Sequence, residues 1–231
     1  MTIPPSASVP DRAQEEFRTL LHAQRVWEQP LPSFDPDEAP GAPLPLFHRW
    51  FAEAVAAGQS EAHTMSLATA GEDGAPDVRI VMLHDADARG WHFATHATSA
   101  KGRQLAARPD AALCFYWPVQ GRQVRIRGLV AAADAAESLA DLHARSTGAL
   151  AAALTGRQSE PLPDLPTLAA ASRAAWHRAE TEPEAPVPTW TRYVLTPSDV
   201  EFFQGDATRR HIRLHYHRAP SAAWHRTLLW P

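Results

Sequence analysis

The chain has 231 residues, of which 45% are hydrophobic and 21% are charged, a composition typical of a globular protein with one core. Lysine and arginine total 22 against 26 aspartates and glutamates, and the formal charge of -4 argues against a nucleic-acid partner. The single cysteine, Cys114, excludes an intramolecular disulfide and a multi-thiolate zinc site. Because no basic leader and no long apolar run occurs, we expect no membrane partner and a cytoplasmic location.

The N-terminal part of the chain is expected to precede the folded domain. Its composition predicts a mobile tail, a helix and a Pro-rich linker, over residues 1–10, 12–27 and 30–45. Over residues 46–57 apolar side chains recur at helical spacing, and Gly58 follows them, so we expect a helix that docks on the domain that follows. We therefore divide the chain into a tail, helix and linker over residues 1–45 and one domain over residues 46–231.

After Gly58 the hydrophobic pattern changes to short β-like runs separated by turn residues. The first runs predict an antiparallel meander of three strands, over residues 65–70, 78–84 and 91–96. A short helix and two more strands are then expected over residues 98–107, 112–117 and 123–130. Alanine-rich helices follow over residues 134–154 and 165–180, and the closing strands cover residues 191–195, 200–203, 210–217 and 224–229. This order predicts an α+β protein built on a small closed barrel.

Cationic side chains stand on the first strands and at a helix start. No dinucleotide fingerprint, P-loop, zinc-peptidase or serine-hydrolase motif occurs. Arg79 begins an otherwise apolar strand, where it either meets an anion or a carboxylate, or reaches solvent from a sheet edge. Lys101, the only lysine, follows the hydroxyl residues Thr98 and Ser99, which are the capping candidates at a predicted helix N-terminus. Free N–H groups and the helix dipole favour a phosphate there, and an exposed capped helix gives the same pattern.

Two later strands carry polar side chains on one face. Alternation places Gln123, Arg125 and Arg127 opposite Val124 and Ile126. The same alternation groups a set of arginines and histidines, namely Arg209, His211, Arg213, His215 and His217. A solvated strand face and a surface that hydrogen-bonds a heterocycle both fit these patterns. No carboxylate or thiolate near the histidines completes a metal site, so we predict no metal.

Taken in order, these segments resemble the pyridoxine/pyridoxamine 5'-phosphate oxidase family, flavoproteins with an FMN-binding split barrel. The resemblance covers residues 46–231 and rests on MSLATAGEDGAPDVRIVML, FATHATSAKGRQLAARP, GRQVRIRG, GRQSE, VEFFQGDATRRHIRL and an end of the form W-x-x-x-x-L-x-P. It implies an antiparallel split β-barrel with peripheral helices and an FMN cofactor. It also implies a homodimer in which the C-terminal strands take part in dimerisation.

The resemblance further implies which residues hold the cofactor. The matching positions are Arg79, Ile80, Val81, Met82, Thr95, Lys101, Gln123, Gln158, Ser159, Phe203 and Arg213. Arg79 and Lys101 would neutralise the FMN phosphate, and Gln123 would address the flavin ring. The sequence departs from the family at Ala100, where a second basic residue is usual, and at Phe203, where tryptophan is usual.

The substrate pocket departs further from the family. The family holds a substrate phosphate with lysine, tyrosine, arginine and serine, and the matching positions here are His84, Asp141, Arg145 and Ala149. Because Asp141 is anionic, we expect a phosphorylated vitamer to bind less well. His84 and Arg145 remain as implied substrate-binding residues. Arg209 and His211, which in the family lie over the substrate ring, are retained as the implied catalytic and substrate-binding pair.

The function that the resemblance implies is an FMN-dependent oxidase. It would transfer hydride from an aromatic or heterocyclic substrate to FMN and then to dioxygen. A phenazine-type biosynthetic oxidase with a non-phosphorylated substrate is the nearest competing function, and the pair Arg145-Ser146 is also similar to that branch. Two roles without oxidase chemistry also fit the resemblance: a flavin-binding protein without turnover, and a split-barrel module for a deazaflavin or haem.

Overall fold

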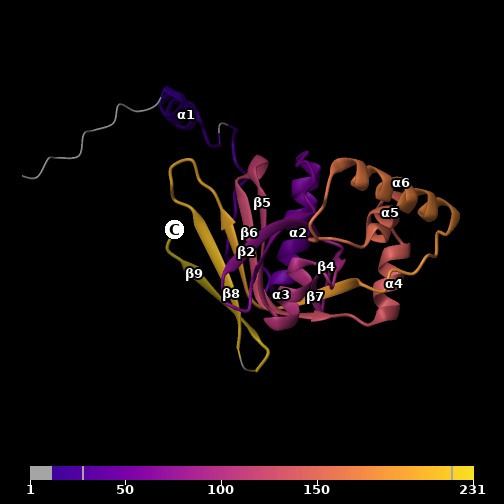
Figure 1. Ribbon diagram of the computed structural model, residues 1–231. Helices are drawn as coiled ribbons and strands as arrows, with labels where there is room; N and C mark the ends of the chain where they lie inside the picture. The colour runs from indigo at the N-terminus through magenta and orange to yellow at the C-terminus, as the bar shows by residue number, and fades with distance from the viewer. Residues whose placement is uncertain (1–11, 28, 220) are drawn as a thin grey trace, which may run out of the picture.

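A computed structural model of the protein describes residues 12–27, 29–219 and 221–231, and the predicted tail over residues 1–10 lies outside these ranges. The described residues form one nine-stranded sheet with helices around it (Figure 1). Every pair of neighbouring strands is antiparallel, and the sheet curls into a half-barrel. The α+β split-barrel fold that the resemblance implied is therefore confirmed, whereas the closed barrel expected from the order of elements is not formed, because the end strands of the described sheet do not pair.

The elements follow one another as α1 (Arg12–Ala23), α2 (Pro43–Ala56), β1 (Thr64–Ala70), β2 (Pro76–Met82), β3 (Asp85–Asp87), β4 (Gly90–His96), α3 (Ala100–Ala107), β5 (Asp110–Trp117), the short 3-10 helix η1 (Pro118–Gln120), β6 (Arg122–Ala132), α4 (Ala135–His143), α5 (Thr147–Thr155), α6 (Leu165–Thr181), β7 (Trp190–Gln204), β8 (Ile212–Arg218) and β9 (Trp224–Leu229). The strand order is β2-β1-β5-β6-β7-β4-β3, and β8 joins β7 to β9. Helices α4, α5 and α6 gather at one end of the molecule, and β8 and β9 lie at the other (Figure 1).

Three helices differ from the sequence prediction. The first helix is shorter than expected and ends at Ala23. The stretch 134–154 forms α4 and α5 instead of one helix, because the Ser146 side chain accepts a hydrogen bond from the Ala149 N–H and starts a new helix. Helix α2 begins at Pro43, inside the expected linker, since proline is tolerated in a first helical turn.

One continuous strand, β7, replaces the two strands predicted over residues 191–195 and 200–203. Its pairing with β6 shifts register between Arg127 and Gly128, where Gly128 lies opposite Pro197. A Cβ atom at Gly128 would lie 2.0 Å from the Thr196 carbonyl oxygen, so only glycine allows this approach. The irregularity lets a proline sit inside a long central strand without ending it.

Two strand boundaries also differ from the prediction. Strand β3 has three residues, too few to give a pattern in the sequence. Strand β8 begins at Ile212, so the expected start of a strand at Arg210 is wrong. The Asp206 carboxylate accepts hydrogen bonds from the backbone N–H and the hydroxyl of Thr208, and this turn delays the strand.

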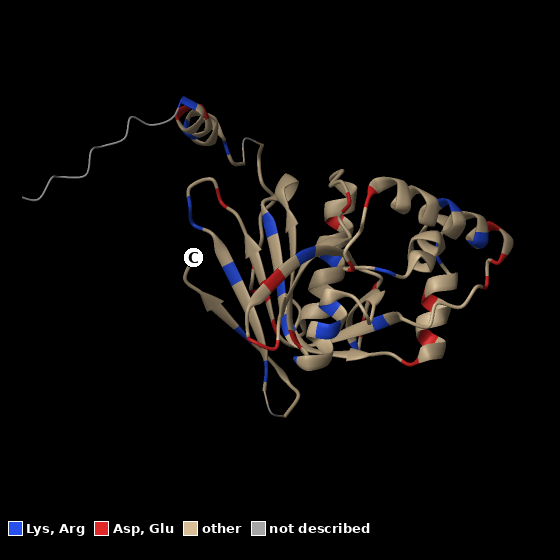
Figure 2. Ribbon diagram, viewed as in Figure 1, with Lys and Arg blue, Asp and Glu red and all other residues tan. Residues whose placement is uncertain are grey.

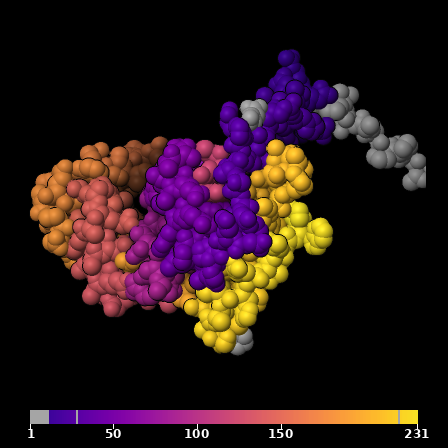
Figure 3. All heavy atoms as spheres, turned by 180° about the vertical axis from the view of Figure 1, so that it is seen from behind, coloured from indigo at the N-terminus to yellow at the C-terminus, as the bar shows by residue number. Residues whose placement is uncertain are grey.

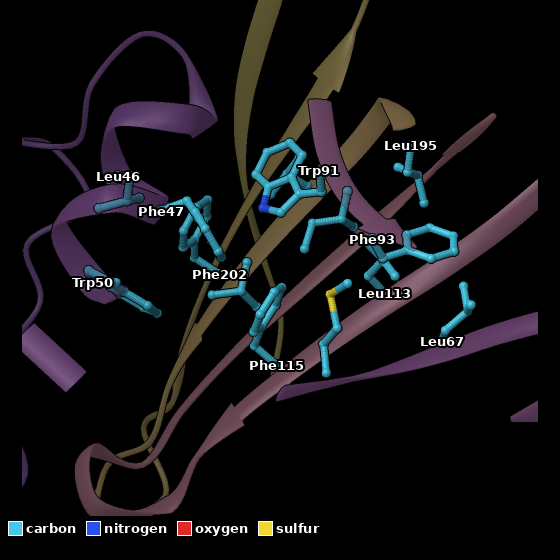
Figure 4. Close-up of a cluster of buried hydrophobic side chains, with 14 of the residues drawn as sticks. Leu46, Phe47, Trp50, Leu67, Trp91, Phe93, Leu113, Phe115, Leu195 and Phe202 are labelled. Atoms are coloured by element: carbon cyan, nitrogen blue, oxygen red, sulfur yellow. The ribbon is translucent and has the colours of Figure 1, made fainter. Parts of the chain in front are cut away.

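The core lies between α2 and the inner face of the sheet (Figure 4). The Phe47 ring centroid lies 5.3 Å from that of Trp91 and 5.1 Å from that of Phe115, and Trp50 lies 5.2 Å from Phe202. All five rings are buried. The docking of this helix on the sheet confirms the sequence prediction, and each such side chain contributes about 1.5–3 kcal/mol of hydrophobic free energy.

The alternation predicted for residues 123–127 is also confirmed. Val124 and Ile126 are buried in the core, whereas Arg125 and Arg127 are exposed and Gln123 is half-buried. The polar side chains therefore mark an outer face of the sheet. Among the described residues, no helix is both long and apolar enough to cross a membrane.

Candidate cofactor and substrate site

Helix α3 begins with a capped first turn that packs closely against the preceding loop. The Ser99 hydroxyl accepts a hydrogen bond of 3.2 Å from the Gly102 N–H, which confirms the predicted capping residue. A Cβ atom at Gly102 would lie 2.3 Å from the Ala97 carbonyl oxygen. The turn can pack this closely only with glycine, and it carries the neighbouring Lys101 inward.

The Lys101 ammonium is buried, with 8% of the residue exposed. Its Nζ donates to the Thr95 hydroxyl oxygen at 3.2 Å, and within the described ranges no carboxylate lies within ion-pair distance of it. Burial and the nearby Arg79 guanidinium lower the pKa of Lys101. Since an ammonium has three donors and burying it unpaired is costly, this position favours an anion.

Loop residues from the far end of α5 complete this region. The Thr95 hydroxyl donates to the Gln158 side-chain oxygen at 2.9 Å. The Ser159 hydroxyl accepts a hydrogen bond of 3.1 Å from the Ala100 N–H at the start of α3. The structure therefore brings together four of the predicted cofactor residues, here called the Lys101 cluster: Thr95, Lys101, Gln158 and Ser159.

Arg79 borders the Lys101 cluster from the edge strand β2. Its guanidinium donates to the Thr69 hydroxyl at 2.6 Å, to the Gln104 side-chain oxygen at 3.0 Å and to Asp77 at 2.5 Å. Arg79 thus meets a carboxylate, that of Asp77, as one of the two sequence expectations had it, and it is not a solvated edge residue. No sequence pattern pointed to Thr69 or Gln104, because each meets Arg79 only through the fold.

Gln123, Phe203 and Arg213 occupy a different place, on the outer face of the sheet. Strand pairing puts them in one cross-strand row, Tyr116, Gln123, Phe203, Arg213 and Leu229. Arg213 donates to both carboxylate oxygens of Glu201, at 2.8 and 3.1 Å. Charges of both signs stand side by side on these strands (Figure 2).

The predicted cofactor residues therefore lie on two faces. Arg79 pairs with Leu67, which belongs to the buried inner face. Ile80 and Met82, its neighbours on β2, point the other way and are exposed. Val81 packs at the edge of the core. Within one chain, Arg79 and the row of Gln123 thus face opposite sides of the sheet.

Three of the aligned substrate positions, His84, Asp141 and Arg145, form a second cluster together with Arg192, here called the His84 cluster. His84 Nδ1–H donates to the two Asp141 carboxylate oxygens, at 3.0 and 3.1 Å, and these two side chains are only 6% and 7% exposed. Arg145 Nε lies 3.4 Å and Arg192 Nη1 3.9 Å from the same carboxylate. The aligned phosphate positions therefore pair with one another. Ala149 follows at the start of α5.

Electrostatics within the His84 cluster keep the histidine neutral and the carboxyl charged. Burial lowers the pKa of His84, in opposition to the nearby Asp141. Burial alone would raise the pKa of Asp141, but the hydrogen bond from His84 and the two arginines lower it. The charged Asp141 carboxylate is thus the counter-charge of the arginines within the His84 cluster.

A network behind this cluster adds further carboxylates. Arg192 donates to His92 Nδ1 at 2.9 and 3.1 Å, so His92 is protonated at Nε2 and donates to Asp87 at 2.8 Å. Arg192 also lies 3.3 Å from Asp85 and 3.6 Å from Glu137. Neither His92 nor Arg192 was predicted from the sequence, because their contact joins distant segments.

Arg209 and His211 lie in the turn before β8. Arg209 is exposed, with a left-handed φ of 69°, and His211 Nδ1 accepts the Asp206 N–H at 3.0 Å. The His211 ring lies 5.2 Å from that of Phe203, centroid to centroid. His211 thus stands beside the row of Gln123, whereas the His84 cluster belongs to different elements.

Comparison with known families gives the same order of segments. The model of the pyridoxamine 5'-phosphate oxidase family matches residues 51–179. The C-terminal dimerisation region of pyridoxine 5'-phosphate oxidase matches residues 190–231. The chain belongs to the pyridoxamine 5'-phosphate oxidase family. The resemblance seen in the sequence is therefore confirmed.

Individual members of the family cover most of the chain. Pyridoxine/pyridoxamine 5'-phosphate oxidase 1 of Ralstonia nicotianae is 42% identical over 189 residues, which is 82% of this chain and 89% of that protein. The enzyme named pyridoxine/pyridoxamine 5'-phosphate oxidase in Hyphomonas neptunium is 38% identical over 99% of this chain and 98% of its own.

A solved structure gives a third comparison within the family. PhzG from Burkholderia lata, in complex with tetrahydrophenazine-1-carboxylic acid, superposes with a TM-score of 0.80 at 30% identity, covering 87% of this chain and 99% of that one. An FMN-binding protein of Nostoc punctiforme, at 21% identity and a TM-score of 0.65, shares the fold. Proteins similar to this chain thus carry names that refer to different small molecules.

Proposed function

We propose that the protein is an FMN-dependent oxidase that acts on an aromatic or heterocyclic substrate. The observation that carries the proposal is the buried Lys101 ammonium, which has no carboxylate partner within the described residues and lies at the start of α3. Membership of the oxidase family supports the same conclusion. A phosphate is the group that such a site fits, because it offers several acceptors and a compensating charge.

The residues of the Lys101 cluster fit the polar end of FMN. Lys101 would hold the phosphate, and Arg79, which also pairs with Asp77, would add positive charge beside it. The hydroxyls of Thr95 and Ser159 would donate to the phosphate or to the ribityl chain. The half-buried Gln123 amide would hydrogen-bond the ring edge. When bound, FMN would supply hydride acceptance and the return of two electrons to dioxygen.

We infer that two copies of the chain build each site. The Lys101 cluster and the row of Gln123, Phe203 and Arg213 are separated by the strands of one sheet, so a second protomer would bring the row to the cluster. Two features support this homodimer: the match to a dimerisation region over residues 190–231 and the exposed apolar side chains of Ile80 and Met82. Twofold symmetry would then give two equivalent sites.

The substrate is proposed to lack a phosphate group. In the His84 cluster Asp141 pairs with His84 and Arg145, and Asp85 and Glu137 lie near Arg192, so a dianion entering there would meet carboxylates. Arg209 and His211 would orient the substrate ring. PhzG, whose structure contains tetrahydrophenazine-1-carboxylic acid, supports a phenazine-type biosynthetic oxidase as the alternative within this chemistry.

A subunit-mixing experiment tests the shared site. Lys101→Ala and Arg213→Ala change opposite halves of the proposed site, so each homodimer has two defective sites. Random exchange of protomers would restore full FMN affinity at about a quarter of all sites. Recovery of tight sites in the mixture, measured by flavin fluorescence titration, supports the proposal. No recovery after exchange, verified with differently tagged chains, contradicts it.

Oxygen consumption tests the substrate proposal. The FMN-loaded protein should oxidise pyridoxine 5'-phosphate with a kcat/KM below about 10⁴ M⁻¹s⁻¹, the lower end of ordinary enzymatic efficiency. A higher value would assign the protein to the vitamer oxidases. A flavin-loaded protein whose flavin is reduced by none of the phosphorylated or unphosphorylated aromatic substrates would instead support a binding role without turnover.

A further inference from the structure

Trp27 contacts both of the residues that the proposed function assigns to the substrate ring. The Arg209 guanidinium carbon lies 5.7 Å from the centre of the indole ring. The His211 ring lies 5.2 Å from the indole, edge to face at 74°. The N-terminal segment that carries Trp27 lies beside the loop between β7 and β8 (Figure 3). An aromatic ring of the chain itself therefore stands against Arg209 and His211.

The Trp27 indole packs directly against two glycines, Gly121 and Gly205, which have no side chains in its place. A Cβ atom at Gly205 would lie 2.8 Å from Trp27 Cζ2, and one at Gly121 would lie 3.0 Å from Trp27 Nε1. The Gly205 N–H donates to the Gly121 carbonyl at 2.8 Å, so the two glycines form one surface. Any side chain at either position would push the indole away.

The indole is nevertheless imperfectly accommodated. Its Nε1–H is buried and has no hydrogen-bond partner among the described residues. Trp27 also has a φ of 56°, in the left-handed region that large side chains rarely adopt. Both features raise the energy of the seated indole, so a ring without these penalties can compete with it.

The groups around the indole indicate the chemistry of such a competitor. His211 accepts a hydrogen bond at Nδ1 from the Asp206 N–H, and Phe203 packs on another side of its ring, at 5.2 Å. Arg209 is exposed and forms no ion pair within the described part of the chain. An aromatic carboxylate would stack where the indole lies and pair with the free guanidinium.

We propose that Trp27 occupies the substrate-ring position against Arg209 and His211 in the resting protein, and that an aromatic carboxylate must displace it. Trp27 is then a specificity-determining residue, because only rings that outcompete the indole bind. The inference rests on the proposed function for its assignment of Arg209 and His211 to the ring. Apparent affinity is reduced by the fraction of molecules in which the indole is seated.

The test uses 1-naphthoate as the probe and isothermal titration of the FMN-loaded dimer. Trp27→Ala should bind the probe at least about tenfold more tightly than the unmodified protein, because no displacement is required. Trp27→Phe keeps a ring in place and should stay within about threefold of it. Trp176→Ala, on the half-exposed surface of α6, is the matched control and should change nothing. Equal or weaker binding by Trp27→Ala overturns the proposal.

A second measurement does not depend on Trp27→Ala being folded. In protein labelled with 5-fluorotryptophan, the fluorine resonance of Trp27, assigned with Trp27→Phe, should move toward the solvent-exposed position when 1-naphthoate saturates the protein. An unchanged resonance at saturation, or no naphthoate binding by any variant, overturns the displacement. The 1-naphthoate titration of the labelled protein is repeated without FMN to separate the Trp27 proposal from the proposed function. A protein that fails to load FMN contradicts the proposed function, but its Trp27 resonance still reports whether naphthoate displaces the indole.

Discussion

The Lys101 cluster holds one cation and the His84 cluster holds two arginines, both at or beside positions where the resemblance implies phosphate contacts, yet their charges are balanced differently. Lys101 is buried beside hydroxyls and has no carboxylate within ion-pair distance among the described residues. In the His84 cluster Asp141 pairs with His84 and lies near Arg145 and Arg192. The comparison leads us to propose that a buried cation binds an external anion where the fold gives it no carboxylate partner, and that a cation already paired with a carboxylate does not.

The largest expected effect is on kcat/KM for a phosphorylated substrate, when the His84 cluster is converted into a phosphate site. The triple change His84→Lys, Asp141→Tyr and Ala149→Ser removes one anion and adds a cation and two hydroxyls. Two new charge-assisted hydrogen bonds of about 1.5 kcal/mol each would raise kcat/KM for pyridoxine 5'-phosphate about 100-fold.

The control for this change is FMN affinity, which should stay the same because the Lys101 cluster is untouched. Oxygen uptake at several substrate concentrations gives kcat/KM. An unchanged value in a folded, flavin-loaded triple variant would mean that this cluster does not meet the substrate.

Removal of the Asp141 carboxylate alone should make the His84 cluster resemble the Lys101 cluster, because cations there would lose a carboxylate partner. Asp141→Asn keeps the shape but leaves Arg145 and Arg192 with one partner fewer, and the free energy of unfolding should fall by about 2 kcal/mol. Added inorganic phosphate should then raise the melting temperature of the variant more than that of the unmodified protein. Glu16→Gln, at an exposed position of α1, serves as the control. Equal phosphate effects in all three proteins would count against the comparison.

The smallest expected effect is a pH dependence of stability. The folded protein holds His84 with a lowered pKa, so below about pH 6.5 the unfolded chain binds a proton that the folded one resists. Stability is therefore lost as pH falls, and the lowered pKa of Asp141 acts in the same direction at more acidic pH. His84→Gln should reduce the loss between about pH 7 and 5 by up to about 1 kcal/mol.

Urea unfolding at each pH measures this effect, with the exposed His217→Gln as the matched control. The His84 variant should show a shallower slope of unfolding free energy against pH than the control. Identical slopes would show that His84 titrates alike in the folded and unfolded chains.

Local features of this protein could be predicted from its sequence. The Ser99 cap and the alternation of Val124 and Ile126 were predicted correctly, because each depends on residues within one element. The joining of the predicted strands into β7 was missed, since the shift that accommodates Pro197 depends on a glycine of another strand.

Site features that join distant segments could not be derived in this way. His84 meets Asp141 across 57 positions, and Arg192 meets His92 across 100. The hydrophobic periodicity of a single helix or strand does not predict a contact between such distant residues. The resemblance to the family named the positions of His84 and Asp141, but their mutual pairing, which changes the charge of the pocket, became visible only in the fold.

The affinity of the Lys101→Ala variant for FMN and for riboflavin tests the central claim most directly. If Lys101 holds the phosphate, the change should weaken FMN binding by about 1.5–3 kcal/mol, the range for hydrogen bonds between charged groups. Riboflavin, which has the same ring and no phosphate, should bind the variant and the unmodified protein almost equally. An equal loss for both ligands would contradict the account, because Lys101 would then act on the ring or on the fold.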